Sequence, residues 1–219
     1  MTEPTKTPAG SMLLARKVNE SLLQWAKSSA KLVVAVDGYT GIGKTTLLRN
    51  LAALNPDVLP VNRDDFLFSS AATQAKLAKA TDRVAVFERE ICDHQKLAAF
   101  ITTYRQSNEP YHIDTYNEDT GEINVTKTFD FSKKIMVVEG IFMFHPELPL
   151  NKLWDKRIYL QGDIADIDKR RVEREKAKWG DDYFPETHPD SYFRAITVGL
   201  KNYIKQYKPE EIADVVFRV

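Results

Sequence analysis

The chain has 219 residues, of which 43% are apolar and 28% charged, and its 31 basic and 31 acidic residues give a formal net charge of zero. This length suits one domain with a sizeable core, and the balanced charge argues against a nucleic-acid-binding or membrane-surface protein. Cys92 is the only cysteine, so no disulfide can form within the chain, as is typical of proteins in a reducing compartment. We therefore expect a cytoplasmic protein whose partners are neither nucleic acids nor membranes.

Residues 1–10 are polar and contain proline, which predicts a flexible tail, and residues 11–219 are expected to form a single domain. Strand and helix patterns then alternate, which favours an α/β fold with a parallel, doubly wound sheet flanked by helices. The predicted elements, in chain order, are a helix at 11–29, a strand at 32–36, a helix after the glycine-rich loop, a strand at 58–61, a helix at 71–80, a helix or two shorter ones over 84–104, a β-hairpin or extended excursion over 111–131, strands at 134–139 and 157–160, helices at 163–178 and 189–207, and a strand at 214–219.

The glycine-rich loop between the first strand and the next helix is the most specific motif in the chain. It reads GYTGIGKT at 38–45 and matches G-x-x-x-x-G-K-[ST], whose backbone N–H groups surround phosphate oxygens at a helix N-terminus. The lysine of this motif reaches the β- and γ-phosphates and the hydroxyl binds Mg²⁺. The alternative is a chance match or a nucleotide pocket without activity. The predicted nucleotide-binding residues are Gly38, Tyr39, Thr40, Gly41, Ile42, Gly43, Lys44, Thr45 and Thr46.

Two acids follow predicted strands, at the edge of the sheet where the loop lies. Asp64, in Arg63-Asp64-Asp65-Phe66, can accept the proton of a substrate hydroxyl or hold a metal-bound water. The alternative for this acidic pair is an Asx turn or a helix N-cap. Glu139, at the end of the strand at 134–139, is placed to hold Mg²⁺ through water, and its alternative is a capping acid at a strand terminus.

Two further segments are candidates for substrate contact. On the charged helix, Arg170 and Arg174 are four residues apart and Arg171 and Arg174 are three apart, so at least two guanidinium groups share a face that a mobile lid can present to a γ-phosphate. The alternative is a solvated helix with Glu–Arg pairs. In the segment at 111–116, aromatic faces can stack on a nucleobase while His112, or Asn117 just after the segment, reads its edge. The alternative is an ordinary strand whose aromatic rings pack on the domain.

Taken together, these motifs resemble the uridine kinase-like branch of the P-loop small-molecule kinases, alongside nicotinamide riboside kinase and phosphoribulokinase. The matching pieces are GYTGIGKTT, RDDF, ICDHQKL, PYHIDTYNEDTGE, VVEGIF and DKRRVERE, in the family's order, from about residue 32 to about residue 180. Leu67 departs from the family, which often has tyrosine there, and Asp64-Asp65-Phe66 is closer to the nicotinamide riboside kinase version.

The resemblance implies a P-loop NTPase fold with a substrate-side hairpin at about 111–131, a helical lid at about 163–182, ATP and Mg²⁺ as cofactors, and a homo-oligomer. It assigns Asp64 as the base for a sugar 5′-hydroxyl and Asp93 as a ligand of ribose hydroxyls. Core packing is the simpler alternative for Phe66. The expected catalytic residues are Asp64, Lys44, Arg171 and Arg174; the expected acceptor-binding residues are Asp64, Phe66, Asp93, Tyr111, His112 and Tyr116; and the expected metal ligands are Thr45, Asp64 and Glu139.

Three functions are compatible with these residues. The first is ATP-dependent phosphorylation of the 5′-hydroxyl of a ribonucleoside, uridine or cytidine first. The second keeps the chemistry but changes the acceptor to nicotinamide riboside, pantothenate or another small alcohol. The third is a regulatory nucleotide-binding ATPase. A GTPase is disfavoured because Asn151-Lys152-Leu153-Trp154 lacks the aspartate of N-K-x-D.

Overall fold

The computed structural model describes residues 9–188 and 191–219. Its main sheet has five parallel strands in the order β2-β5-β1-β6-β7, which confirms the predicted doubly wound α/β architecture. The strands are β1 (Leu32–Gly38), β2 (Val58–Asn62), β5 (Ile135–Glu139), β6 (Lys156–Gln161) and β7 (Val215–Arg218).

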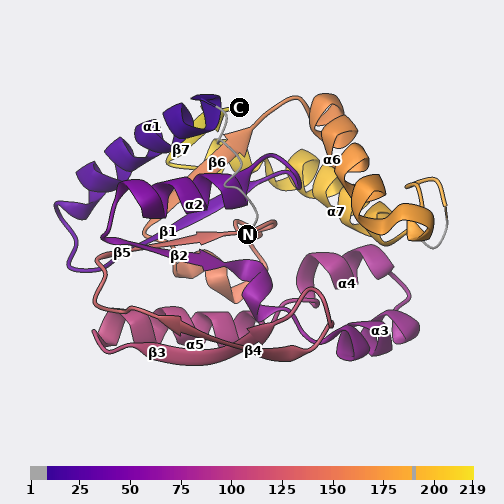
Figure 1. Ribbon diagram of the computed structural model, residues 1–219, viewed down its shortest axis with the longest axis horizontal. Helices are drawn as coiled ribbons and strands as arrows, with labels where there is room; N and C mark the ends of the chain where they lie inside the picture. Colours follow the sequence, from indigo (N-terminus) through magenta and orange to yellow (C-terminus); the bar gives the residue numbers. More distant parts are fainter. Residues whose placement is uncertain (1–8, 189–190) are drawn as a thin grey trace, which may run out of the picture.

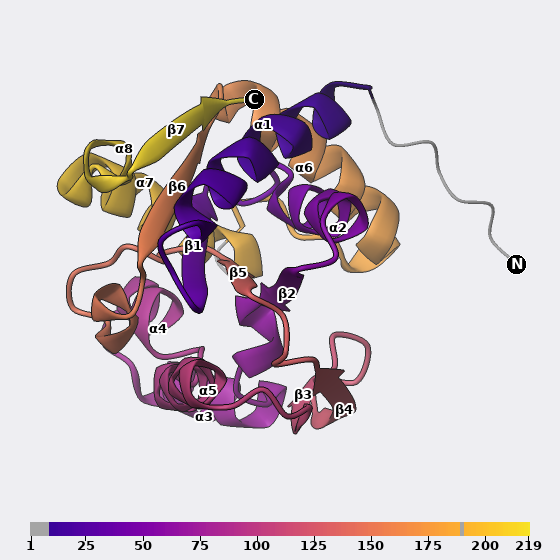
Figure 2. The ribbon, with the colours of Figure 1, turned by 90° about the vertical axis from the view of Figure 1, so that its left-hand side faces the viewer.

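Helices connect these strands and cover both faces of the sheet, as Figures 1 and 2 show. Within the described ranges, none of them has the length and apolar character needed to cross a lipid bilayer. The α-helices are α1 (Ala9–Ala26), α2 (Lys44–Leu54), α3 (Ser70–Lys79), α4 (Arg83–Arg89), α5 (His94–Gln106), α6 (Ile164–Trp179), α7 (Tyr192–Tyr207) and α8 (Pro209–Ile212), and the 3₁₀ helices are η1 (Arg63–Phe66), η2 (Pro149–Lys152) and η3 (Gly180–Asp182).

The predicted elements differ from the structure mainly at their ends. Helix α1 begins at Ala9, inside the predicted tail, and ends at Ala26, earlier than expected. The rest of that tail, residues 1–8, lies outside the described residues, as do the first two residues of the helix predicted at 189–207. The segment at 84–104 forms two helices, because the chain turns at residues 90–93 and Cys92 forms an isolated antiparallel bridge with Leu67, the residue after η1. There the Asp93 side chain caps the new helix by accepting a hydrogen bond from Lys96 N at 2.9 Å.

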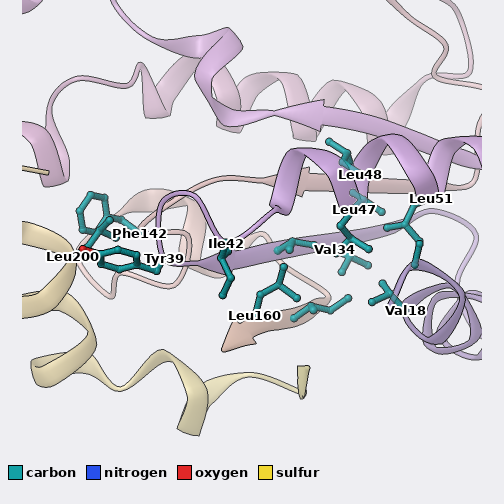
Figure 3. Close-up of a cluster of buried hydrophobic side chains, with 14 of the residues drawn as sticks. Val18, Val34, Tyr39, Ile42, Leu47, Leu48, Leu51, Phe142, Leu160 and Leu200 are labelled. Carbon is teal, nitrogen blue, oxygen red and sulfur yellow. The ribbon is translucent and has the colours of Figure 1, made fainter. Parts of the chain in front are cut away.

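Strand β1 is buried on both faces, which explains its continuous apolar sequence. Val34 points towards α1 and α2, where it meets Val18 and Leu47 in the cluster shown in Figure 3. Val33 points to the other face and belongs to a second cluster, built with α5 around Phe100. The sheet therefore separates two hydrophobic cores, with α1 and α2 on one side and α5 on the other (Figures 1 and 2).

The predicted excursion is a separate antiparallel hairpin of β3 (Tyr111–Tyr116) and β4 (Ile123–Phe129). It lies beside α5, at the bottom of Figure 1. Gly121 has a φ of 73° in the connection, a conformation that favours glycine, and its carbonyl accepts a hydrogen bond from Ser70 N. The hairpin is thereby attached to the start of α3.

The carboxyl ends of β1, β2 and β5 lie at one edge of the sheet. The glycine-rich loop, η1 and Glu139 follow these three strands. Helices α3, α4, α6 and α7 gather at this end, on the right of Figure 1. Open parallel sheets bind their ligands at this edge, so the topology brings the predicted site residues to one place.

Candidate active site

The loop between β1 and α2 has the backbone geometry of a phosphate-binding loop. Gly41 and Gly43 have φ angles of 82° and 108°, so a side chain at either position would strain the loop. Gly43 is also the N-cap of α2 and contributes no side chain, which leaves the first N–H groups of the helix open to an anion. Two side chains of the motif are structural: Ile42 points into the core, and the buried Tyr39 ring lies near Phe142 (Figure 3).

Lys44 is buried under this loop. Its Nζ donates hydrogen bonds to the carbonyl oxygens of Gly38 at 2.8 Å and Tyr39 at 3.1 Å. Burial lowers the pKa of Lys44, while the nearby carboxylates of Glu139 and Asp37 act in the opposite direction. An ammonium has three N–H donors, so one remains for a phosphate oxygen after these two bonds.

Thr45, in the first turn of α2, and Glu139, the last residue of β5, form a pair of oxygen ligands. The Thr45 hydroxyl donates to Oε1 of Glu139 at 2.8 Å, and Glu139 is 4% exposed. Burial raises the pKa of Glu139, while Lys44 acts in the opposite direction. Hard oxygen ligands of this kind fit Mg²⁺, which usually takes only one or two protein ligands and completes its shell with phosphate and water. No group of three or more His, Cys, Asp or Glu suited to a metal occurs in the described part of the chain.

Asp64 lies in η1, directly after β2, with its side chain 48% exposed. The N-cap of this short helix is Asn62, whose side chain accepts a hydrogen bond from Asp64 N at 2.9 Å. The helix is therefore capped by Asn62 and not by Asp64. The carboxylate of Asp64 is not used for capping and is available to a substrate hydroxyl. Its negative charge raises the pKa of both Lys44 and Glu139, although burial is the larger influence on each.

Arg63 is a site residue that the sequence reasoning missed. Its side chain is 1% exposed, and no nitrogen of its guanidinium group has a hydrogen-bond partner among the described residues. The nearest carboxylate is Asp64, with Oδ1 at 3.8 Å from Nη1. A Cβ placed on Gly140 would lie 2.8 Å from Cβ and Cδ of Arg63, so glycine is needed there for the arginine to fit. An arginine is normally exposed, and no sequence pattern signals its burial.

Asp93 and the hairpin are both fastened to η1. The backbone N–H of Asp93 donates to the Phe66 carbonyl at 2.8 Å, which joins Asp93 to the last residue of η1. Lys127, on β4, donates to Oδ1 of the buried Asp65 at 2.6 Å. These two bonds therefore connect the hairpin and the start of α5 to the turn that carries Asp64.

The four remaining residues expected to bind the acceptor, three of which lie on the hairpin, all contact other parts of the protein. Phe66 is 1% exposed and packs edge-to-face on Phe100 at 5.2 Å, so its ring lies in the core beneath the site. Tyr111 stacks on Phe131 at 5.1 Å, which favours the packing alternative for this ring. The remaining two contact neighbouring elements: His112 bonds to Thr128 across the hairpin at 2.9 Å, and the Tyr116 hydroxyl lies 3.2 Å from Oγ of Ser70.

The two predicted lid arginines on α6 have different surroundings. Arg171 is 1% exposed and lies against the phosphate loop, where a Cβ on Gly41 would be 3.3 Å from its Cβ. Its guanidinium pairs with Asp168 and Glu186. Arg174 is 61% exposed and donates to Glu175 at 2.7 Å. In this structure the two guanidinium groups therefore do not face one another, and only Arg171 is beside the loop.

The fold agrees with the comparison of the chain with known proteins. Residues 33–219 match the model of the Phosphoribulokinase / Uridine kinase family. The chain belongs to this family. It is accordingly an ATP-dependent kinase of small molecules.

Individual relatives of this kinase are distant. It is 24% identical over 188 residues to a uridine kinase of Borrelia garinii subsp. bavariensis, with 84% of each chain covered. It is 23% identical over 145 residues to human nicotinamide riboside kinase 1, a match that spans 65% of this chain and 64% of the human protein, less than two thirds of its length. Among solved structures, a possible uridine kinase from Bacillus stearothermophilus aligns with a TM-score of 0.62 at 18% identity, covering 92% of this chain and 99% of the other.

Proposed function

We propose that this kinase transfers the γ-phosphoryl group of ATP to the 5′-hydroxyl of a ribonucleoside, with uridine or cytidine as the first candidates. The observation that carries the proposal is the hydrogen bond from Asp93 N to the Phe66 carbonyl, which joins the start of α5 to the 3₁₀ helix that carries Asp64. An acceptor site for a ribonucleoside needs a base for the 5′-hydroxyl and a carboxylate that accepts hydrogen bonds from the ribose hydroxyls. The similarity to uridine kinases supports this choice of acceptor.

In the proposed reaction, Asp64 orients the 5′-hydroxyl and accepts its proton. A bond forms from the hydroxyl oxygen to the γ-phosphorus while the bond from that phosphorus to the β–γ bridging oxygen breaks, and ADP leaves. Lys44 and Arg171 stabilise the charge on the transferring group. Arg174 takes part only after it exchanges its bond to Glu175 for one to phosphate.

Thr45 and Glu139 are the residues that would hold Mg²⁺, with Asp64 beside them, and the ion would neutralise charge on the β- and γ-phosphates. Glu139 fits this role because its carboxylate is buried, so a nearby cation compensates for the lost hydration. The N–H groups at the start of α2 hold the phosphates in line with the acceptor.

A panel assay tests the proposal. ADP release with Mg-ATP is measured against uridine, cytidine, adenosine, nicotinamide riboside, pantothenate and a control without acceptor. Strong stimulation by uridine or cytidine, with the 5′-monophosphate as product, is the expected result. ADP release that no acceptor changes would instead indicate a regulatory ATPase.

Nicotinamide riboside is the second candidate acceptor. It presents the same ribose 5′-hydroxyl and diol to Asp64 and Asp93, and the human relative is named for it. If only nicotinamide riboside stimulates ADP release, the proposed mechanism stays the same. The base bound next to the hairpin is then nicotinamide and not uracil or cytosine.

A further inference from the structure

Asp168, on α6, lies where the lid helix, the phosphate loop and α7 meet. Its Oδ1 accepts hydrogen bonds from Nε of Arg171 at 3.3 Å and from Nη2 at 3.2 Å. Its Oδ2 accepts a hydrogen bond from the Tyr39 hydroxyl at 3.3 Å and lies 3.5 Å from Nζ of Lys201. One carboxylate thus contacts its own helix, the phosphate loop and α7.

The bonds to Arg171 fix the direction of its guanidinium group. The stem of Arg171 packs on Gly41, and its guanidinium carbon lies 5.4 Å from the centre of the Phe193 ring. Because the guanidinium is planar, two bonds from Nε and Nη2 to one oxygen leave it little freedom to rotate. Nη1 is buried and has no hydrogen-bond partner among the described residues, so Arg171 keeps donors for a phosphate oxygen.

The bond to Tyr39 connects this arginine to the loop itself. Tyr39 is the second residue of the motif and is 2% exposed. Burial raises the pKa of Tyr39, and Asp168 raises it further, so the phenol keeps its proton and donates. Asp168 therefore responds to the position of the phosphate loop and holds the arginine at the same time.

Glu186 also pairs with Arg171 but differs from Asp168 in its placement. It lies in the segment after η3, whereas Asp168 is one turn away from Arg171 on the same helix. Asp168 therefore keeps its place relative to the arginine in any rigid-body displacement of α6, whereas Glu186 lies on a different segment. A phosphate group that approaches Arg171 competes with Glu186, while the bonds to Asp168 can persist.

We propose that Asp168 is a positioning residue for phosphoryl transfer, which orients Arg171 towards the γ-phosphate and couples the lid to the phosphate loop through Tyr39. The proposal rests on the role given to Arg171 in the proposed function. It does not depend on which acceptor the kinase uses, because Arg171 and Tyr39 lie on the nucleotide side of the site.

Asp168→Asn tests the proposal, with Asp166→Asn as the matched control on an exposed position of the same helix. Affinities for ATP and ADP are measured by competition with a fluorescent nucleotide, and kcat is measured with the acceptor that stimulates the wild-type enzyme. We expect Asp168→Asn to lower kcat about 10- to 100-fold, since small misplacements of positioned groups have effects of this size. Affinity for ATP should fall about 3- to 10-fold, and that for ADP, which lacks the γ-phosphate, less than about twofold. Asp166→Asn should change none of these values.

A second pair of variants separates positioning from general stability. In an Arg171→Ala background, Asp168→Asn should cause little further loss of kcat, because the group it positions is already absent. Equal losses of ATP and ADP affinity, an additive loss of kcat, or an unchanged kcat in Asp168→Asn would overturn the proposal. If no acceptor stimulates the wild-type enzyme, the proposed function fails, and the ratio of ATP to ADP affinity still decides the role of Asp168.

Discussion

The hydroxyl of Thr45 donates a 2.8 Å hydrogen bond to the carboxylate of Glu139. This bond joins the helix after the phosphate loop to the end of the neighbouring strand β5, next to β1 in the sheet. It shows that the two oxygen donors expected to serve Mg²⁺ are already within reach of each other.

Glu139→Gln is expected to weaken the use of Mg²⁺. Glutamine has a similar shape and can still accept the bond from Thr45, but it lacks the negative charge. The Mg²⁺ concentration for half-maximal rate should rise by at least about tenfold. The measurement is a Mg²⁺ titration of the initial rate at saturating ATP, with Glu173→Gln on the exposed face of α6 as the control. An unchanged Mg²⁺ requirement would remove Glu139 from the metal site.

Asp64→Asn is expected to remove most of the turnover and leave ATP affinity unchanged. The amide cannot accept the proton of the acceptor hydroxyl, and general-base catalysis contributes about 10²- to 10⁴-fold. Single-turnover kinetics and equilibrium ATP binding provide the two readouts. The exposed Asp57→Asn is the control. If Asp64→Asn retained full activity, the hydroxyl would have another base.

The ion pair of Lys127 with Asp65 is expected to hold the hairpin against η1. Lys127→Met leaves the carboxylate of Asp65, 11% exposed at its side chain, without its partner at 2.6 Å. The free energy of unfolding should fall by about 1–3 kcal/mol, because a buried acceptor loses its hydrogen bond. Urea unfolding measures the change, and Lys79→Met on α3, whose lysine is exposed, is expected to have almost no effect. Equal changes in the free energy of unfolding for the two variants would mean that the Lys127–Asp65 ion pair does not hold the hairpin.

Arg63→Met is expected to separate stability from activity. The buried guanidinium has no hydrogen-bond partner among the described residues, so methionine should leave the free energy of unfolding unchanged or raise it by about 1–4 kcal/mol. We expect kcat/KM for the acceptor to fall at least about tenfold, since Asp64 loses the nearest cation. Urea unfolding and steady-state kinetics are measured on the same preparation, with Arg63→Lys alongside. A large loss of stability in Arg63→Met would show that the guanidinium has a structural partner.

His94 is expected to make stability depend on pH. Burial, together with the positive charge of Arg63, lowers the pKa of His94 from 6.5 to about 3, and His145 and Lys76 act in the same direction. Between these values the unfolded chain binds the proton and the folded chain does not, so stability is full above about pH 6.5 and falls as the pH drops towards 3. The slope is about 1.4 kcal/mol per pH unit, or about 2 kcal/mol between pH 6.5 and 5.

Urea unfolding of the wild-type protein and of His94→Gln at pH 7, 6 and 5 checks this expectation. The variant should show a shallower dependence on pH, whatever its stability at pH 7. Identical slopes for the two proteins would mean that other groups cause the acid sensitivity.

The sequence by itself determined the nucleotide side of this kinase. The loop at 38–45 is a local motif, and its glycines, lysine and threonine act through backbone geometry that neighbouring residues supply. Asp64 and Glu139 could be predicted at the same edge because the carboxyl ends of parallel strands meet there. The hairpin followed from local turn chemistry and the lid helix from the family pattern.

Only the tertiary structure decided which of these side chains pack in the core and which remain at the site. Phe66 and Tyr111 are aromatic residues that suit either a base-binding surface or a core, and the structure packs both rings on other aromatic rings. The burial of Arg63 depends on the absence of a side chain at Gly140, in another strand's loop. Tyr39 and Asp168 are 129 residues apart, and the bond between them exists because α6 packs against the phosphate loop. Such contacts depend on how separate elements dock, and no periodicity or spacing in the sequence encodes them.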